Sequence, residues 1–297
     1  MAQTTISPKS SLNSKFITIN GSKMHYIEAG EGDPILFLHG MPASSYVWRN
    51  IIPAVCEKAR CLAPDLIGMG QSDKPDISYD IQSHIQYIDA FIKALNLKNV
   101  TLVVHGLGSI IGFNYAAQNT DNIRAIAFYE SYLGELDSWQ KFSLPMQQLM
   151  TALQNHPDHS STLEDKNLIK KIFNIACLRK LSQEEFENYS QPFLQSSDRK
   201  ALEYYVKEFP FGSKDPQIVQ LILNYTNYLQ QSAVPKLMLY HVPGFITSIA
   251  QVEWCKEHFK NLTLADLGEG LHFVQEYNPQ EFSQALLNWY NSFTQSR

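Results

Sequence analysis

The chain has 297 residues, of which 44% are hydrophobic and 18% charged, with a formal net charge of −5 and a pI of about 6.0. This composition is typical of a globular protein with one large domain or two small ones, and it excludes a disordered or fibrous chain. The mildly acidic balance gives no electrostatic case for a nucleic-acid or anionic-membrane partner. No stretch approaches the ~20 consecutive apolar residues that span a bilayer.

Cysteine usage and the start of the chain both favour a cytoplasmic protein. The 4 cysteines are scattered without the spacing of a metal site, and we expect them to be reduced thiols, mostly in the core. Residues Met1–Ile6 contain no apolar run, so we expect no secretory signal. We therefore expect a cytoplasmic monomer or weak homodimer that uses no metal and no cofactor.

Short apolar runs alternate with helical patterns along most of the chain. The turn Asn20-Gly21-Ser22 predicts a hairpin between the first two strands. Apolar residues at helical spacing from Tyr87 to Leu95, and the amphipathic segment Pro279–Phe293, predict helices. The alternation predicts an α/β protein with a doubly wound, mostly parallel, eight-stranded sheet. The predicted strands are Lys15–Ile19, Met24–Glu28, Ile35–Leu38, Arg60–Ala63, Val100–Val104, Ala125–Tyr129, Lys236–Tyr240 and Leu262–Ala265.

Residues 135–230 break this alternation. They are rich in helix formers and aromatic residues and contain no β-like run. Such an insertion predicts a helical cap over the carboxyl ends of the strands, where ligands bind in open α/β sheets. We therefore divide the chain into a core of residues 1–134 and 231–297 and a cap of residues 135–230.

Gly106 occupies the position where the surrounding sequence calls for a nucleophile. The segment Val103–Ser109 is typical of an apolar strand, a sharp turn and the start of a helix. In α/β-hydrolase folds this corner presents a reactive side chain at the top of the sheet. Glycine presents none, and Ser109 lies inside the first helical turn, where a capping or packing role is expected instead.

His272 and Glu130 are the candidates for proton transfer. His272 lies in the glycine-rich run Gly268–Phe273 after the last predicted strand, where such folds place their base. Imidazole titrates near neutral pH, which suits a general acid or base. Glu130 directly follows strand Ala125–Tyr129, and a carboxylate there could orient the imidazole and stabilise its cation.

Two backbone donors are expected beside this pair. Gly40 permits a close backbone approach, so the N–H of Met41 could stabilise an oxyanion, with the N–H of Leu107 as the second donor. Asp65 is another acid near a strand end, and we expect it to bind backbone amides and fix its loop.

Together these segments resemble the haloalkane dehalogenases, in particular the branch that also contains coelenterazine luciferase. The resemblance covers nearly the whole chain and implies an α/β-hydrolase fold with a helical cap. The matching stretches are Phe37–Pro53, Ala63–Asp76, Gln191–Leu194, Val234–Leu237 and Gly270–Pro279.

The resemblance also implies roles for single positions. The nucleophilic aspartate of the family falls on Gly106, and its halide-binding asparagine and tryptophan fall on Met41 and Leu107. Its base and acid fall on His272 and Glu130, which are both present. The implied apolar substrate pocket includes Trp139, Phe142, Phe173, Phe245, Ile246 and Phe273.

Halide displacement of the family's type needs a carboxylate that forms an ester with the substrate, so we predict no ordinary dehalogenase activity. We predict an enzyme that uses His272 and Glu130 on a small apolar molecule without a covalent intermediate. Hydrolysis, elimination, cyclisation, carbon–carbon cleavage and cofactor-free oxygenation are all compatible with that chemistry. Two alternatives stay open: a non-catalytic small-molecule binder, and an engineered dehalogenase whose nucleophile was deleted.

Overall fold

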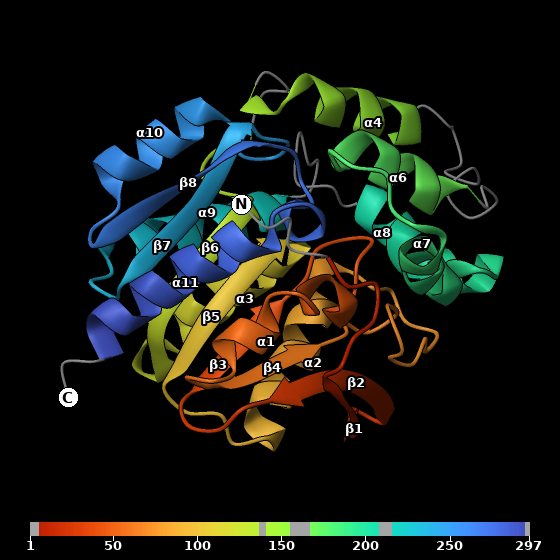
Figure 1. The fold of residues 1–297 in the computed structure, drawn as a ribbon, viewed down its shortest axis with the longest axis horizontal. Helices are drawn as coiled ribbons and strands as arrows, with labels where there is room; N and C mark the ends of the chain where they lie inside the picture. Colours follow the sequence, from red (N-terminus) through yellow and green to blue (C-terminus); the bar gives the residue numbers. More distant parts are fainter. Residues whose placement is uncertain (1–5, 137–140, 155–166, 208–215, 295–297) are drawn as a thin grey trace.

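A single eight-stranded sheet runs through the centre of the molecule (Figure 1), with the strand order β1-β2-β4-β3-β5-β6-β7-β8. The computed structural model describes residues 6–136, 141–154, 167–207 and 216–294. β2 pairs antiparallel with β1 and β4, and the other neighbouring pairs are parallel, so the predicted sheet is confirmed. The strands are β1 (Asn13–Ile19), β2 (Ser22–Ala29), β3 (Pro34–Leu38), β4 (Arg60–Pro64), β5 (Val100–Gly106), β6 (Ile123–Ser131), β7 (Lys236–Pro243) and β8 (Leu262–Gly270).

Helices cover both faces of this sheet. Figure 1 shows α1 and α11 in front of the strands and α3 and α9 behind them. α1 packs on α11, while α2 and α9 pack on α3. These helices of the core are α1 (Ile52–Val55), α2 (Ile81–Ala94), α3 (Leu107–Gln118), α9 (Pro216–Gln231), α10 (Ile249–His258) and α11 (Pro279–Thr294), with short turns η1 (Ser45–Trp48), η2 (Thr120–Asn122) and η6 (Val274–Glu276).

A group of helices between β6 and β7 lies beyond the strand ends (Figure 1). α4 packs on α6 and α8, and α6 packs on α7. These elements are α4 (Leu144–Gln154), α6 (Leu168–Ala176), α7 (Gln183–Ser190), η4 (Gln191–Phe193), η5 (Ser196–Arg199) and α8 (Lys200–Lys207).

The last helix of the predicted cap, α9, packs on the core. The ring of its Tyr225 lies 5.4 Å from that of Phe113 in α3. The division of the chain at residues 134 and 231 stays a prediction, and this contact favours a cap that ends before residue 216.

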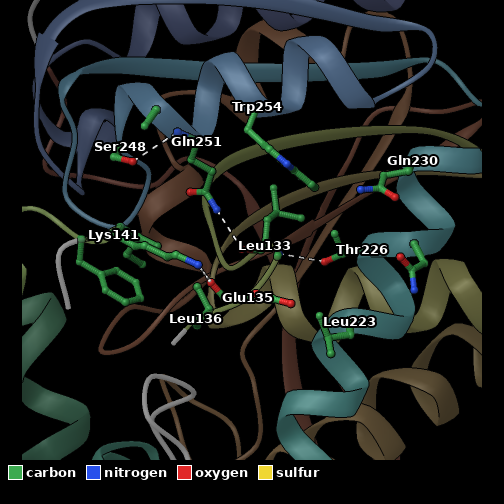
Figure 2. Close-up of a pocket in the computed structure, with 15 residues that line it drawn as sticks. Leu133, Glu135, Leu136, Lys141, Leu223, Thr226, Gln230, Ser248, Gln251 and Trp254 are labelled. Carbon is green, nitrogen blue, oxygen red and sulfur yellow. Dashed lines mark hydrogen bonds between the residues drawn. The ribbon is translucent and has the colours of Figure 1, made fainter. Parts of the chain in front are cut away.

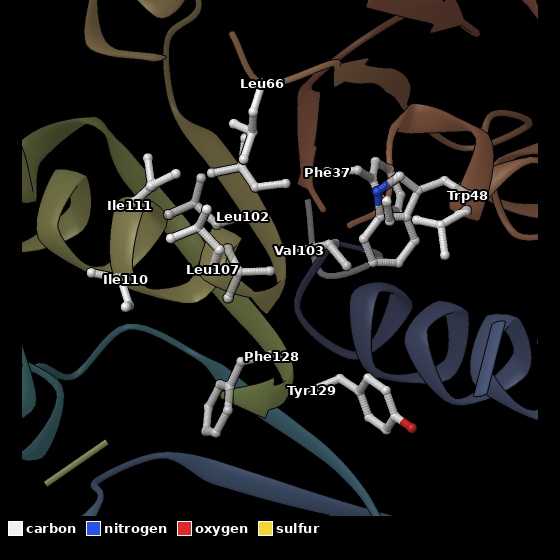
Figure 3. Packing of buried hydrophobic residues seen from close by; sticks show 14 of the residues in the cluster. Phe37, Trp48, Leu66, Leu102, Val103, Leu107, Ile110, Ile111, Phe128 and Tyr129 are labelled. Atoms are coloured by element: carbon white, nitrogen blue, oxygen red, sulfur yellow. The ribbon is translucent and has the colours of Figure 1, made fainter. Parts of the chain in front are cut away.

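Side chains of the central strands alternate between two apolar layers (Figure 3). Phe128 of β6 packs on Phe113 with ring centres 5.5 Å apart. Its neighbour Tyr129 points to the other face, with its ring 5.8 Å from Phe282 of α11. Successive residues of a strand face opposite sides, so a sheet covered on both faces needs the near-continuous apolar runs seen in this sequence.

Gly108 lets α3 come unusually close to the sheet. A Cβ at this residue would lie 2.4 Å from the carbonyl oxygen of Leu38, closer than any real side chain could stand. Because α3 begins at the tip of β5, this approach fixes the corner at Gly106 against the end of β3.

Candidate active site

Gly106 forms a sharp corner between β5 and α3. Its φ of 54° and ψ of −125° lie where glycine is free and other residues are strained. Ser109 stabilises this corner, because its Oγ donates to the Gly106 carbonyl oxygen at 2.7 Å and accepts the N–H of Tyr132 at 3.1 Å. These bonds give Ser109 the structural role expected from the sequence.

The open side of Gly106 faces His272. A Cβ placed on Gly106 would lie 3.4 Å from both Cε1 and Nε2 of the imidazole and 3.2 Å from Cα of Gly40. A side chain at position 106 would therefore point at the ring nitrogen that could accept its proton. The structure brings Gly106 and His272 together from chain positions that are far apart.

Glu130 holds the other side of the imidazole. Its Oε2 lies 3.1 Å from Nδ1 of His272, and both residues are buried. An ionised carboxylate accepts the Nδ1–H and so leaves the lone pair of Nε2 directed toward Gly106. This arrangement is compatible with the predicted role of His272 as a general base.

The Glu130 carboxylate is fixed by the loop after β7. Backbone N–H groups of Phe245, Ile246 and Thr247 donate to it at 3.1, 2.6 and 3.3 Å. Burial raises the pKa of this carboxyl, but the hydrogen bond with His272 and the nearby His241 outweigh burial and leave the pKa lowered. Glu130 is therefore ionised at neutral pH, as the orientation of His272 requires.

His241 is a neighbour of Glu130 that the sequence analysis missed. It lies in β7, and its Nε2 is 4.0 Å from Oε1 of Glu130 and 3.4 Å from the hydroxyl of Tyr129. Burial lowers its pKa more strongly than Glu130 raises it. The available sequence signal was a polar residue near the carboxyl end of a predicted parallel strand. Because β7 borders β6, which carries Glu130, a side chain at that end of β7 can lie near the carboxylate.

His105 and Asp65 have structural roles. The Nε2 of His105 hydrogen-bonds the backbone oxygen of His272 at 3.0 Å, and burial lowers the His105 pKa well below its usual value. Asp65 accepts the N–H groups of Ser45 and Gln71 at 2.7 and 2.8 Å, as expected for a residue that fixes a loop.

The two predicted backbone donors flank the corner. Leu107 is the first residue of α3, where backbone N–H groups have no partner within the helix. Met41 follows Gly40, the residue in closest approach to the Cβ position of residue 106. This placement is compatible with an oxyanion site, and the donor roles stay a prediction.

A small apolar cavity of about 40 Å³ lies over His272, between the strand ends and helices α4, α6 and α8. We call it the imidazole cavity. Only Tyr205 and His272 among its lining residues carry a polar side-chain group. The lining consists of Met41, Pro42, Met146, Leu149, Met150, Leu153, Leu168, Ile172, Ala176, Leu202, Tyr205, Val206, Phe245, Ile246 and His272.

The expected pocket residues divide into several groups. Phe245 and Ile246 line the imidazole cavity, whereas Phe142 lines a separate, larger pocket with Ile246. Phe173 and Phe273 stack on each other with ring centres 4.3 Å apart. The ring centre of Phe273 also lies 4.8 Å from that of His272, edge to face. Trp139 lies outside the described residues.

No helix among the described residues is long and apolar enough to cross a membrane. Within the same ranges, no group of three or more histidine, cysteine or acidic side chains is arranged to hold a metal ion. The cytoplasmic location, the oligomeric state and the absence of a cofactor stay predictions.

The comparisons with known proteins agree on one group. The family profile described as the alpha/beta hydrolase fold matches residues 33–279. A haloalkane dehalogenase of Agrobacterium fabrum is 35% identical over 269 residues, which are 91% of this chain and 88% of that protein. One from Sphingobium indicum is 36% identical over 278 residues, covering 92% of this chain and 93% of that protein.

Solved structures give the same result. The haloalkane dehalogenase DatA of Agrobacterium tumefaciens superposes with a TM-score of 0.88 at 34% identity, covering 94% of this chain and 96% of that one. DbeA of Bradyrhizobium elkani superposes with a TM-score of 0.90 at 31% identity, covering 95% of this chain and 98% of that one.

Proposed function

Because the chain belongs to the haloalkane dehalogenase-like family of α/β hydrolases, we propose that it is an enzyme that has kept the family's acid/base pair but not its nucleophile. His272, oriented by Glu130, transfers protons to and from a small apolar substrate, and no covalent ester forms. One observation carries this proposal: the imidazole Nε2 faces residue 106, which is a glycine.

The charge arrangement supports a base that works near neutral pH. The Glu130 carboxylate is ionised and held by backbone N–H groups, so it stabilises the imidazolium that forms when His272 takes a proton. The space left by glycine can hold the water molecule or substrate group that gives up that proton. Hydrolysis by direct water attack, elimination, cyclisation, carbon–carbon cleavage and cofactor-free oxygenation all need such a base.

The surroundings favour an apolar substrate. Methionine, leucine and isoleucine side chains line most of the imidazole cavity. Met41 and Leu107 offer no side-chain N–H to a leaving halide, and Gly106 offers no carboxylate to displace it. We therefore propose that haloalkanes are not substrates, although the named relatives are haloalkane dehalogenases.

The test is a turnover screen with small apolar esters, ketones and 1-bromobutane. We expect turnover of at least one ester or ketone, a loss on the order of 10²–10⁴-fold in His272→Ala, and no bromide release from 1-bromobutane. Equal turnover by wild type and His272→Ala would rule out the pair as the catalyst. Tight binding of an unchanged ligand, equally strong in His272→Ala, would instead support a non-catalytic binder.

A further inference from the structure

A second and much larger pocket lies beside the imidazole cavity. It has a volume of about 710 Å³ and lies between α9, α10 and the chain after β6 (Figure 2). We call it the outer pocket. The imidazole cavity is smaller, at about 40 Å³. The outer pocket falls in the ~300–1,000 Å³ range of small-molecule sites.

Ile246 is shared by the two spaces. Its side chain lines both the imidazole cavity and the outer pocket, and it is buried. Its backbone N–H donates to Glu130 at 2.6 Å, the shortest of the bonds that fix this carboxylate. A molecule in the outer pocket would therefore touch the residue that separates it from His272 and helps to hold Glu130.

The walls of the outer pocket indicate the chemistry of its ligand. Apolar side chains from three segments meet there, among them Leu133, Leu223 and Trp254 (Figure 2). Two of the polar side chains are occupied in holding the wall: Gln251 donates to the Leu133 carbonyl oxygen at 3.0 Å, and Thr226 accepts the N–H of Gly134 at 3.1 Å. These bonds join α10 and α9 to the chain after β6.

Two amide side chains lie at the rim of the outer pocket. Within the described ranges, the side chains of Asn227 and Gln230 on α9 make no hydrogen bond to the protein. Among the described lining residues, one side chain is a cation, Lys141, and one is an anion, Glu135. Amides can both donate to and accept from a carbonyl, hydroxyl or amide group of a neutral ligand.

We propose that the outer pocket binds a neutral small molecule with an apolar body and one hydrogen-bonding end, and that Ile246 is the partition between this molecule and His272. The body lies against the leucine, isoleucine and tryptophan side chains, and the polar end meets Asn227 and Gln230. Binding at this site does not require catalysis by His272.

Titration of the full chain with Nile red, a neutral fluorophore with an apolar body and a carbonyl group, tests the site. We expect saturable binding to one site per chain. Asn227→Trp places a large side chain at the pocket rim and should weaken binding at least tenfold. Ala250→Trp, on the opposite wall, should do the same. The matched control Asn224→Trp lies on the same helix but lines a different hollow, and it should bind as wild type does.

The partition is tested by the imidazole NMR resonances of His272. Saturating Nile red should shift them in wild type and Asn224→Trp, but not in Asn227→Trp. His272→Ala should bind Nile red within twofold of wild type, so failure of the proposed chemistry and failure of this site are separate results. Absence of binding would overturn the proposal, and so would equal binding by Asn227→Trp, Ala250→Trp and wild type. If wild type does not bind the dye but forms a dimer, and if Asn227→Trp and Ala250→Trp are monomers, the pocket instead binds a second copy of the chain.

Discussion

Gly106 and His272 face each other so closely that one added Cβ on residue 106 would lie 3.4 Å from Nε2 of the imidazole. The dihedral angles of Gly106 are those of a strained corner that glycine adopts without cost. The corner therefore leaves space beside the imidazole, and residue 106 places no side chain in it.

Gly106→Asp should permit attack on carbon. We expect a carboxylate at this position to displace bromide from 1-bromohexane and to form an ester that intact-protein mass spectrometry detects as one added hexyl group. The reaction should be slow, because Met41 and Leu107 give the leaving bromide no side-chain N–H. The positive φ should also lower the free energy of unfolding by about 1–3 kcal/mol.

Gly106→Asn is the matched control for this change. It imposes similar strain and size but carries no carboxylate, so its stability should resemble that of the aspartate variant and its mass should not change. An adduct on the asparagine variant or on wild type would show that another residue attacks the halide.

Glu130→Gln should remove the orientation of the base. The amide cannot stabilise an imidazolium, so we expect turnover to fall on the order of 10²–10⁴-fold. Loss of hydrogen bonds to a charged group should lower the free energy of unfolding by about 1.5–3 kcal/mol. Steady-state kinetics and urea unfolding measure both effects.

Glu28→Gln is the control, because Glu28 is another acid at a strand end but pairs with Lys15 and Arg60 on β1 and β4. Its turnover should match wild type. An equal loss in both variants would mean that Glu130 acts only through the stability of the fold.

The positions of the strands along the chain could be predicted because buried parallel strands require apolar runs, but their ends could not. β8 continues from the predicted Leu262–Ala265 to Gly270, with Glu269 paired to Val242 of β7. Backbone pairing between β7 and β8 continues after the apolar pattern has ended. The sequence pattern therefore underestimated how far the strands extend toward the site.

The candidate site positions carry stronger local sequence signals than their neighbours do. The corner at Gly106 and the loop of His272 carry local signals in glycine and strand pattern. The contacts of His241 and of the Ile246 N–H with Glu130 depend on which strands and loops meet across the sheet, and no local pattern predicts them. The ion pair of Arg49 with Glu276 joins residues 227 positions apart, so it too appears only in the fold.

Buried histidines should make stability fall as the pH is lowered. Burial in α2 lowers the pKa of His84 from 6.5 to about 4. Below pH 6.5 the His84 imidazole is protonated in the unfolded chain, but in the folded protein it stays neutral until the pH approaches 4. The free energy of unfolding is therefore unaffected by His84 protonation above pH 6.5. It falls between pH 6.5 and 4, on the order of 3 kcal/mol in total.

His84→Leu should therefore flatten the dependence of unfolding free energy on pH in this window, as urea titrations at several pH values would show. His39, His105 and His241 shift in the same direction, so part of the slope should remain. Gln86→Leu, an exposed position on the same helix that does not titrate, should leave the slope at its wild-type value. An unchanged slope in His84→Leu would show that His84 is not the group that resists protonation.

The effects of Arg49 and Glu276 on the free energy of unfolding should depend on each other. The side chains are fully buried, and the guanidinium meets both carboxylate oxygens. Arg49→Met leaves the Glu276 carboxylate with Arg179 as its remaining cationic partner, and we expect a loss of about 3 kcal/mol of unfolding free energy. The double variant with Glu276→Met removes both charges, and it should recover at least half of that loss because apolar side chains tolerate burial. A urea double-mutant cycle measures the coupling, and single losses that simply add would contradict it.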